Sequence, residues 1–578
     1  MLLMKIQLKV TLVLLVCCTT LFAQNNLHGI IVDKASKEPL PFANILDTRT
    51  EHGAACDEMG LFELPDVQIG DTLLVSYVGY ETQAVLIQSI GPKLQIELEP
   101  LKNVLSEFVV RPDNEFLFEL LDRVRKNHST SPLDSKTYFL LETNIDDTRV
   151  EVLESYYQGS FKDHGIAELE LKKGRAGRAF TEDNQTFHSS STSRVFLKYS
   201  LFKNSPLFPV NPLAMRASKM RKFFALKLED ILLHKGHKMY VVSFESKSDD
   251  VEAFSGRYWI DTEGSRLVKV EQEIKGSSVH PFIPIGDLEI IDMDLALVQN
   301  FDIWGSKEYL QQMDFNYEVT FKGKSQQIEK ANTKAFMRAF APGEYYNLPL
   351  FDFGTYFDYR NILVPGYDED FWSSNRAFSI YSQQEEIETF LEKQKMQFRD
   401  AVFVNNDLNT NTSWFEWPFF VWDSTRIHMK SASDSLIQAS KVNYAFEEDR
   451  YHFCFKLYAD CTPEDGVVNY QLGVVMDPFC SYYYLPVDKW AMAFMNIHFD
   501  LLEIVKRELD EELNHKIDLT VDDFRYLVGV YQKKYDDWSR TFRKESRNGK
   551  DHIQLIKWAG IVKEELGIDN TYFFEMDN

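Results

Sequence analysis

The chain has 578 residues, which is too many for a single hydrophobic core, so we expect about three domains. Hydrophobic residues make up 44% of the chain and aromatic residues 14%, and this composition excludes a mostly disordered protein. The formal net charge of −25 argues against nucleic acids and anionic membrane surfaces as partners.

The first 23 residues have the pattern of a secretory signal peptide. Lys5 and Lys9 precede a short apolar run, and Ala23 is the small residue that a signal peptidase requires. We therefore predict an exported protein in the periplasm or associated with the outer membrane, without a transmembrane span after cleavage. Lipidation stays open, although neither candidate cysteine follows the usual Gly or Ala; the candidates are Cys17 and Cys18.

Residues 24–100 alternate short apolar runs with turn-forming residues. The runs 27–33, 42–46, 61–64 and 72–78 are rich in strand-forming side chains, and Pro, Gly and Asp lie between them. Strands this short with turns this regular predict a small antiparallel β-sandwich.

Three motifs in this region resemble the carboxypeptidase-regulatory-like domain: Gly29 to Asp33 followed by PLPFANI, DEMGLFEL from Asp57, and SYVGYE from Ser76. That family has a transthyretin-like, seven-stranded sandwich and is common at the N-termini of Gram-negative envelope proteins, including TonB-dependent receptors. Cys56 stands where the family usually has a threonine. The resemblance implies a non-catalytic domain with structural roles for Gly29, Asp33, Pro41, Ala43, Asp57, Gly60, Phe62, Gly79 and Tyr80.

Two consequences of this resemblance concern function. In the family, the glycine of the VGY motif, here Gly79, lets the strand bend so that the flanking aromatic rings pack. A zinc carboxypeptidase needs an HxxE pair, yet none of the 13 histidines here precedes a glutamate by three residues, and no HExxH motif occurs. The family name therefore implies no peptidase, and we predict no cofactor.

Residues 101–131 form a predicted linker and helix. Asp113 or Asn114 is the expected N-cap, and apolar side chains recur at helical spacing from Phe116 to Val124. The basic residues that follow suit a helix C-terminus, although they could instead bind an anion.

Residues 132–345 form a predicted antiparallel sheet of long alternating strands, with one hairpin turned at Glu263 and Gly264. This strand style resembles the curved, half-open barrels of periplasmic lipoprotein carriers, which would provide an apolar surface for lipid. The alternative is an ordinary packed sheet. A transmembrane barrel is disfavoured because the strands are few and carry charge on both faces.

Residues 346–578 form a predicted α+β region that ends in helices. The YDEDFW element at 367–372 could bind Ca²⁺ through its acids, but a solvated turn fits its spacing better. One or two helices follow near 488–516. Thr520 with Asp523 predicts a capping box for the next helix, and a last helix near 551–566 stops at Gly567.

The strongest catalytic and metal-binding candidates lie in the first of these helices. The catalytic candidates are His498, Asp500 and Glu503, and the metal candidates are Glu511 and His515, which are four residues apart. His498 and Asp500 do not share a helical face, so a histidine held among acids in a structural role is the competing interpretation.

Three cysteines close in sequence could provide one disulfide in an exported chain: Cys454, Cys461 and Cys480. The sequence does not select the pair, and buried free thiols are equally compatible with the spacing.

Together these features predict a multi-domain, mainly β, exported envelope protein and favour a non-enzymatic role over an enzymatic one. In this prediction the sandwich is an interaction or spacer module, and the larger regions bind an envelope protein, a lipid or a glycan. The alternatives are a metal-dependent hydrolase using the His498–His515 helix and a periplasmic lipid carrier using the central sheet.

Overall fold

The computed structural model describes residues 27–575 except 42, 50–52, 57–58, 65–66, 92, 104–113, 129, 146–147, 180–194, 196, 235–236, 249–250, 283–288, 323–326, 352, 354–360, 363–367, 369–370, 373–386, 388, 392–419, 423–425, 427–450, 465 and 484–488. The chain divides into two compact units. The first comprises Met1–Asn103, Leu232–Lys235 and Trp372–Glu385. The second comprises Val104–Ile231, Gly236–Phe371 and Glu386–Asn578.

The first unit contains a sandwich of two small sheets, with strand orders β4-β1-β7 and β3-β2-β5-β6. Its strands are β1 (Leu27–Asp33), β2 (Asn44–Asp47), β3 (Gly53–Ala55), β4 (Leu61–Leu64), β5 (Thr72–Ser76), β6 (Gln83–Leu86) and β7 (Leu94–Leu98). Alternate side chains of these strands, such as Ile31, Leu73 and Val75, form one buried apolar core. The seven-stranded sandwich is confirmed, but β1 and β7 pair in parallel, so the sheets are not purely antiparallel.

The VGY glycine lies just after β5 with a backbone φ of +93°, which only glycine adopts without strain. The backbone turns here, because the Tyr80 N–H donates to the Tyr77 carbonyl at 3.0 Å. The Tyr77 and Tyr80 rings lie 5.4 Å apart on either side of Gly79. Beyond the sandwich, β8 (Lys102–Asn103) pairs with Leu232 and Leu233 of the same unit.

The second unit contains a large open sheet in the order β11-β10-β9-β18-β17-β16-β15-β14-β13-β12. Every strand pairing in it with a described register is antiparallel. The strands are β9 (Leu133–Ile145), β10 (Thr148–Lys162), β11 (Gly165–Arg178), β12 (Phe224–His234), β13 (His237–Ser246), β14 (Ser255–Asp261), β15 (Arg266–Ser277), β16 (Glu289–Trp304), β17 (Lys307–Lys322) and β18 (Ile328–Pro342). The predicted central antiparallel sheet is therefore confirmed.

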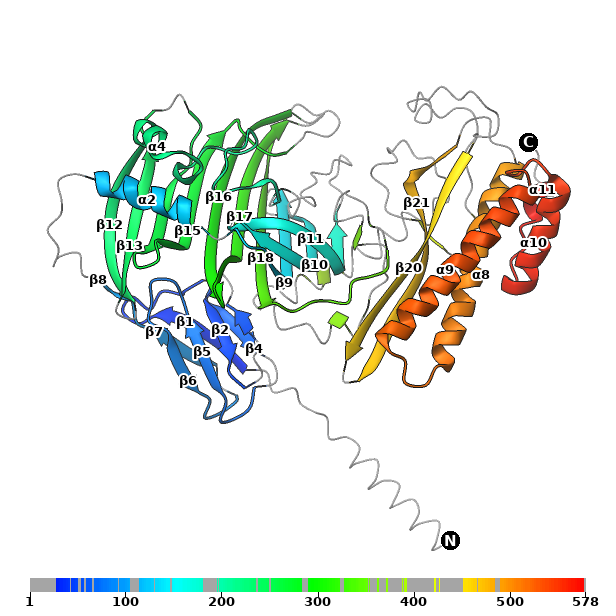
Figure 1. Ribbon diagram of the computed structural model, residues 1–578, viewed down its shortest axis with the longest axis horizontal. Coiled ribbons are helices and arrows are strands. Elements are labelled where there is room, and N and C mark those ends of the chain that lie inside the picture. The colour runs from blue at the N-terminus through cyan, green and yellow to red at the C-terminus, as the bar shows by residue number, and fades with distance from the viewer. Residues whose placement is uncertain are drawn as a thin grey trace, which may run out of the picture. The chain divides into compact units, whose positions relative to one another are not determined.

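One face of this sheet packs against helices. Figure 1 shows α2 (Glu115–Asn127) lying across the strands, with α4 (Ala217–Phe223) nearby. The buried side of α2, including Leu117 and Leu121, shares one apolar core with this sheet face and with the short helix η2 (Pro212–Ala214). Asn114 is the N-cap residue, but its side chain donates to the Leu226 carbonyl at 2.9 Å. Asn114 is therefore the N-cap residue, as predicted, although its side chain makes a tertiary contact in place of a capping hydrogen bond.

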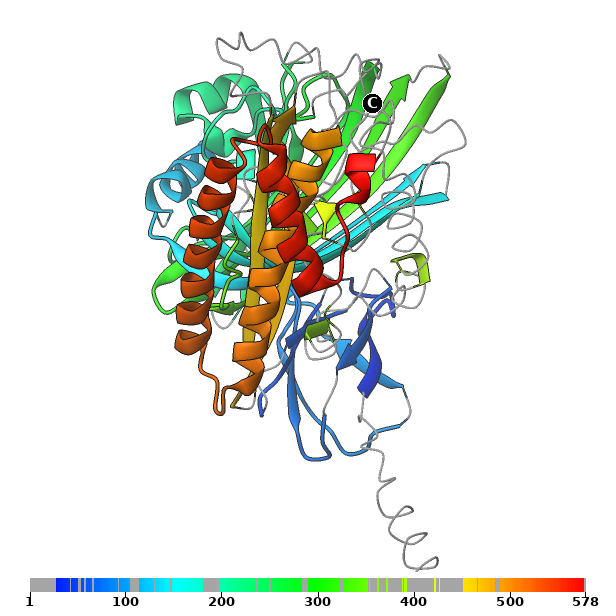
Figure 2. The ribbon, with the colours of Figure 1, turned by 90° about the vertical axis from the view of Figure 1, so that its right-hand side faces the viewer.

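The same unit holds a β-hairpin and a group of helices at the C-terminal end, as the predicted α+β region requires. The strands are β19 (Phe420–Val421), β20 (Tyr451–Glu464) and β21 (Val467–Tyr483), in the order β19-β21-β20. The helices are α8 (Lys489–His515), α9 (Val521–Glu545), α10 (His552–Leu566) and α11 (Tyr572–Glu575). Figure 2 shows the long helices in front of the hairpin, and their apolar faces share one core with it.

The helix signals of this region are confirmed. Thr520 and Asp523 form the capping box of α9, and α10 ends at Gly567, whose backbone is left-handed. The stretch near 488–516 is one helix, α8. Among the described helices, none is long and apolar enough to span a membrane.

Candidate functional site

Two consecutive lysines on β11 are among the buried charged residues of the second unit. Lys172 and Lys173 have side chains that are 1% and 2% exposed. Consecutive residues of a regular strand point to opposite faces, but the pairing of β10 with β11 shifts register here. Tyr156 is opposite Lys173 and Tyr157 is opposite Leu171, so Lys172 is the extra residue of a β-bulge. A bulge re-aims a side chain, which allows both lysines to reach the same carboxylate.

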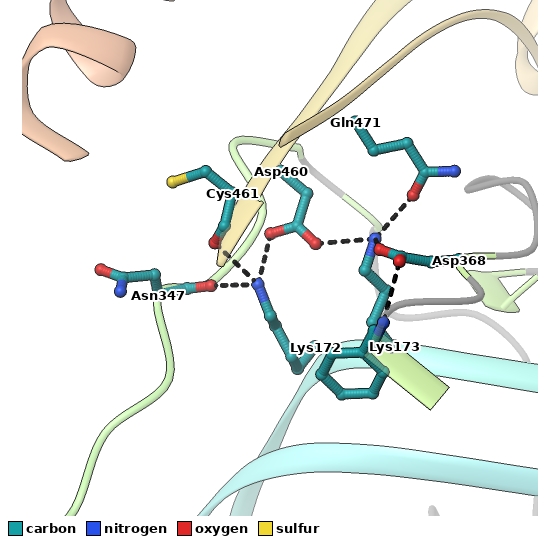
Figure 3. Close-up of polar contacts among 8 residues, drawn as sticks. Lys172, Lys173, Asn347, Asp368, Asp460, Cys461 and Gln471 are labelled. Atoms are coloured by element: carbon teal, nitrogen blue, oxygen red, sulfur yellow. Dashed lines mark hydrogen bonds and ion pairs between the residues drawn. The ribbon is translucent and has the colours of Figure 1, made fainter. Parts of the chain in front are cut away.

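That carboxylate belongs to Asp460 of β20 and lies between the two ammonium groups (Figure 3). Its Oδ1 is 2.6 Å from the Lys172 Nζ, and its Oδ2 is 2.9 Å from the Lys173 Nζ. Lys172 also donates to the backbone carbonyls of Asn347, at 2.7 Å, and Cys461, at 3.0 Å. All three N–H groups of this ammonium therefore have acceptors.

Lys173 is held by a second set of oxygens. Its Nζ donates to the Gln471 Oε1 at 2.6 Å and lies 3.0 Å from the Asp368 Oδ2. The ammonium also lies 5.7 Å from the centre of the Tyr458 ring, within reach of a cation–π contact. With Asp460, it too has three oxygen partners. Asp368 comes from the YDEDFW element, and its Oδ1 caps the Phe371 N–H at 3.0 Å.

These contacts form a neutral cluster of two ammonium groups and two carboxylates, which we call the lysine cluster (Lys172, Lys173, Asp368 and Asp460). Burial lowers the pKa of Lys172, and the Asp460 carboxylate opposes that shift. The cluster leaves no N–H of either lysine without an oxygen partner. Its chemical effect is to fasten β11 of the sheet to the β20–β21 hairpin.

Sequence reasoning missed this cluster. The run ELELKKG at residues 168–174 predicts only a strand with charged side chains, and nothing in it indicates a bulge. Lys172 and Asp460 are 288 residues apart, so no local pattern could pair them. The single available signal was two adjacent lysines at the end of a strongly alternating strand.

His498 lies in the core between α8 and α9. Its Nε2 contacts the Ser539 Oγ at 2.7 Å, and the Phe455 ring lies 5.0 Å away. Burial lowers the pKa of His498 to about 3, and the positive charge of Arg543 adds to the shift. The imidazole is therefore neutral at physiological pH, with Ser539 as its polar partner.

Asp500 points to a different set of residues. Its carboxylate accepts from the Arg426 Nη1 at 2.7 Å, the Trp422 Nε1 at 2.9 Å and the Asn570 Nδ2 at 2.7 Å. Burial raises the pKa of Asp500, and the Arg426 guanidinium opposes the change. The structure therefore does not bring His498 and Asp500 to one site.

The remaining predicted residues of α8 are engaged along their own helix. Glu503 pairs with Arg507 at 2.9 Å, one turn away. The His515 Nδ1 contacts the backbone carbonyl of Glu511 at 2.6 Å, and both side chains are exposed. Within the described residues, no group of three or more His, Cys, Asp or Glu side chains could hold a metal ion. Catalysis by His498, Asp500 and Glu503 and metal binding by Glu511 and His515 stay predictions.

The predicted structural motif lies in the sandwich, apart from Asp57, which is outside the described residues. Gly29 of β1 is opposite Phe62 of β4, and a Cβ at Gly29 would come within 2.4 Å of the Phe62 ring. Asp33 accepts from the Ser36 N–H at 2.6 Å, and this bond contributes most to its lowered pKa. Gly60 has a positive φ, Ala43 is fully buried, Pro41 lies in the turn before β2, and Tyr80 forms a bridge with Pro100.

The cysteines take different states. Cys454 is disulfide-bonded, whereas Cys461 and Cys56 are buried free thiols. Cys461 is therefore excluded from the predicted bridge, and the side chain of Cys480 lies outside the description. The Cys56 thiol donates to the Leu40 carbonyl at 2.9 Å.

Comparison with protein families gives one match. The model of the CarboxypepD_reg-like domain matches residues 27–110. Residues 27–110 form a CarboxypepD_reg-like domain. The match confirms the resemblance for this domain and covers no other part of the chain. Comparison with curated proteins finds no match.

Solved structures give only distant similarities. A LolA superfamily protein from Nitrosomonas europaea is 14% identical, with 38% of this chain and 91% of that chain covered and a TM-score of 0.16. A putative outer membrane lipoprotein-sorting protein domain from Vibrio parahaemolyticus is 8% identical, with 45% and 97% covered and a TM-score of 0.18. A chain of the Pseudomonas aeruginosa MucA/MucB complex is 6% identical, with 38% of this chain and 92% of that chain covered and a TM-score of 0.15. TM-scores this low support no argument about fold or function.

Proposed function

We propose that this chain is an exported, non-enzymatic envelope protein whose CarboxypepD_reg-like domain is an interaction or spacer module. The larger second unit is the part that binds a partner or ligand. The protein resides in the periplasm or at the outer membrane, as the pattern of residues 1–23 predicts.

One observation supports a non-catalytic protein above all: four buried ionisable side chains of the second unit are held by contacts within the protein. Lys172 and Lys173 each have three oxygen partners. Asp500 has three donors, and His498 is neutral against Ser539. A catalytic acid or base must exchange a proton with substrate, which these contacts do not favour.

The test is site-specific photo-crosslinking in intact cells, followed by envelope fractionation and mass spectrometry. A photoreactive amino acid replaces Ile69 of the CarboxypepD_reg-like domain, 67% exposed, or Ile553 of α10, 78% exposed. A matched control replaces buried Ile31. We expect one envelope protein or glycan to be captured reproducibly from an exposed position and not from the control. Recovery of the chain uncrosslinked in the cytoplasm would contradict the proposal.

The hydrolase alternative has a separate test in the metal content of the purified full chain. Stoichiometric zinc that is lost in Glu511→Gln and His515→Asn variants would favour it. We expect neither substitution to change the metal content. His498→Gln serves as the matched variant, since His498 lies in the core of the same helix.

A further inference from the structure

Two glutamines lie inside the apolar core between the central sheet and its helices. Gln272 is on β15 and is opposite Leu297 of β16, and Gln299 is two residues further along β16. Residues opposite each other, or two apart on one strand, share a face of the sheet, so the two amides are diagonal neighbours. Gln299 is fully buried and Gln272 is 2% exposed.

Most of the polar atoms of this pair lack hydrogen-bond partners. The Gln272 Oε1 accepts from the Tyr199 hydroxyl. In the described part of the chain, the Gln272 Nε2 and both the Oε1 and Nε2 of Gln299 have no partner. Buried polar side chains are nearly always satisfied by protein, water or a ligand, because an unsatisfied amide costs free energy. Three orphaned atoms on neighbouring side chains therefore point to a bound group.

The surroundings define the chemistry of that group. Val270, Leu297 and Met313 flank Gln299 on the same face and are buried in the apolar core. The charged residues of this stretch, such as Lys269 and Glu271, are at alternate positions and pair with each other on the other face. An ionised group would be buried here without a counter-charge, which is strongly unfavourable.

We propose that Gln272 and Gln299 bind the head group of a neutral amphiphile whose apolar chain lies among the core residues between the sheet and its helices. The head both accepts and donates hydrogen bonds, because the site offers two amide N–H₂ groups and one carbonyl oxygen. An ester or amide carrying a hydroxyl group meets this requirement. The inference rests on the proposed function, in which the second unit binds ligand, and it names the class of that ligand.

Tyr199 covers Gln272, because its hydroxyl donates to the Gln272 Oε1, and the segment that it begins provides the route of entry. Tyr199 precedes a stretch up to Arg216 in which the described regular structure is the single turn of η2. Such irregular segments open at lower free energy than strands or long helices. The ligand enters by displacing this cover, and the Tyr199 hydroxyl then exchanges its bond to Gln272 for one to the ligand.

The experiment is a titration of the purified full chain with monoolein, followed by calorimetry and native mass spectrometry. Gln299→Met and Gln272→Met keep side-chain length and remove the amide. Gln312→Met is the matched control, since Gln312 is opposite Asn300 and therefore lies on the other sheet face, equally buried. We expect one monoolein per chain, with affinity about tenfold lower in Gln299→Met and unchanged in Gln312→Met. Oleate at pH 8, which carries a charge, is expected to bind more weakly than monoolein.

Two outcomes would overturn the inference: no binding of monoolein, or equal binding by wild type and Gln299→Met. Thermal unfolding without ligand checks that each variant folds. If Gln299→Met is destabilised and monoolein does not bind, buried water fills the site and the inference fails. Crosslinking from Ile69 or Ile553 uses other residues, so the proposed function can stand or fail independently of this result.

Discussion

The CarboxypepD_reg-like domain and the second unit are stabilised in different ways. The domain has an apolar core built from the alternate residues of short strands, and its polar groups, such as Asp33, bond to nearby turns. The second unit places full charges in its interior, where the lysine cluster joins strands far apart in sequence. The difference teaches that local chemistry specifies the first fold, whereas long-range polar contacts fix the arrangement of the second.

The largest effect is expected from Asp460, because its carboxylate serves both buried lysines. Asp460→Asn keeps the volume but leaves two ammonium groups with reduced compensation, which lowers the free energy of unfolding by about 3–5 kcal/mol. Urea unfolding measures this change. The control is Asp537→Asn, which breaks an exposed pair with Arg540 and should have no measurable effect. If the two substitutions lower the free energy of unfolding equally, the buried carboxylate of Asp460 contributes no more to stability than the exposed one of Asp537.

The first domain was largely predictable because its signals are local. A turn residue such as Gly60 and the alternation of LFEL act within a few residues, and the same is true of the Thr520 capping box in the second unit. Asn114 is the N-cap as predicted, but its side-chain bond goes to Leu226, 112 residues away, which no local signal shows. The lysine cluster was unpredictable for the same reason. It also requires a β-bulge, which two adjacent lysines in a sequence do not predict.

A second prediction concerns pH and His498. Because the pKa of His498 is lowered to about 3 from 6.5, the unfolded chain binds a proton below pH 6.5 that the folded chain does not. The stability that the neutral His498 contributes is fully present above pH 6.5 and declines as the pH falls toward 3. Between pH 7 and pH 5 this residue alone removes about 2 kcal/mol from the free energy of unfolding.

His498→Phe should abolish that part of the pH dependence, since phenylalanine suits the aromatic surroundings and does not titrate. The measurement is urea unfolding of wild type and variant at pH 7 and pH 5. His498→Gln, which retains a hydrogen-bonding group for Ser539, is the second variant. If the variants lose as much stability as wild type between the two pH values, His498 is not a neutral residue of the folded core.

The smallest change in the free energy of unfolding is expected in the first domain, from a substitution at Gly79. Its φ of +93° strains any residue with a Cβ, but a Cβ placed there would meet no atom within 4 Å. Gly79→Ala should therefore lower the free energy of unfolding by about 1 kcal/mol through backbone strain alone. Gly529 of α9 is the matched control, since it too has open space around a Cβ but has no positive φ. Gly529→Ala should stabilise the protein by about 1 kcal/mol, because alanine favours a helix. If Gly79→Ala lowers the free energy of unfolding and Gly529→Ala raises it, Gly79 is needed for its backbone conformation in the turn between Tyr77 and Tyr80. If both substitutions change the free energy of unfolding in the same direction, that role is contradicted.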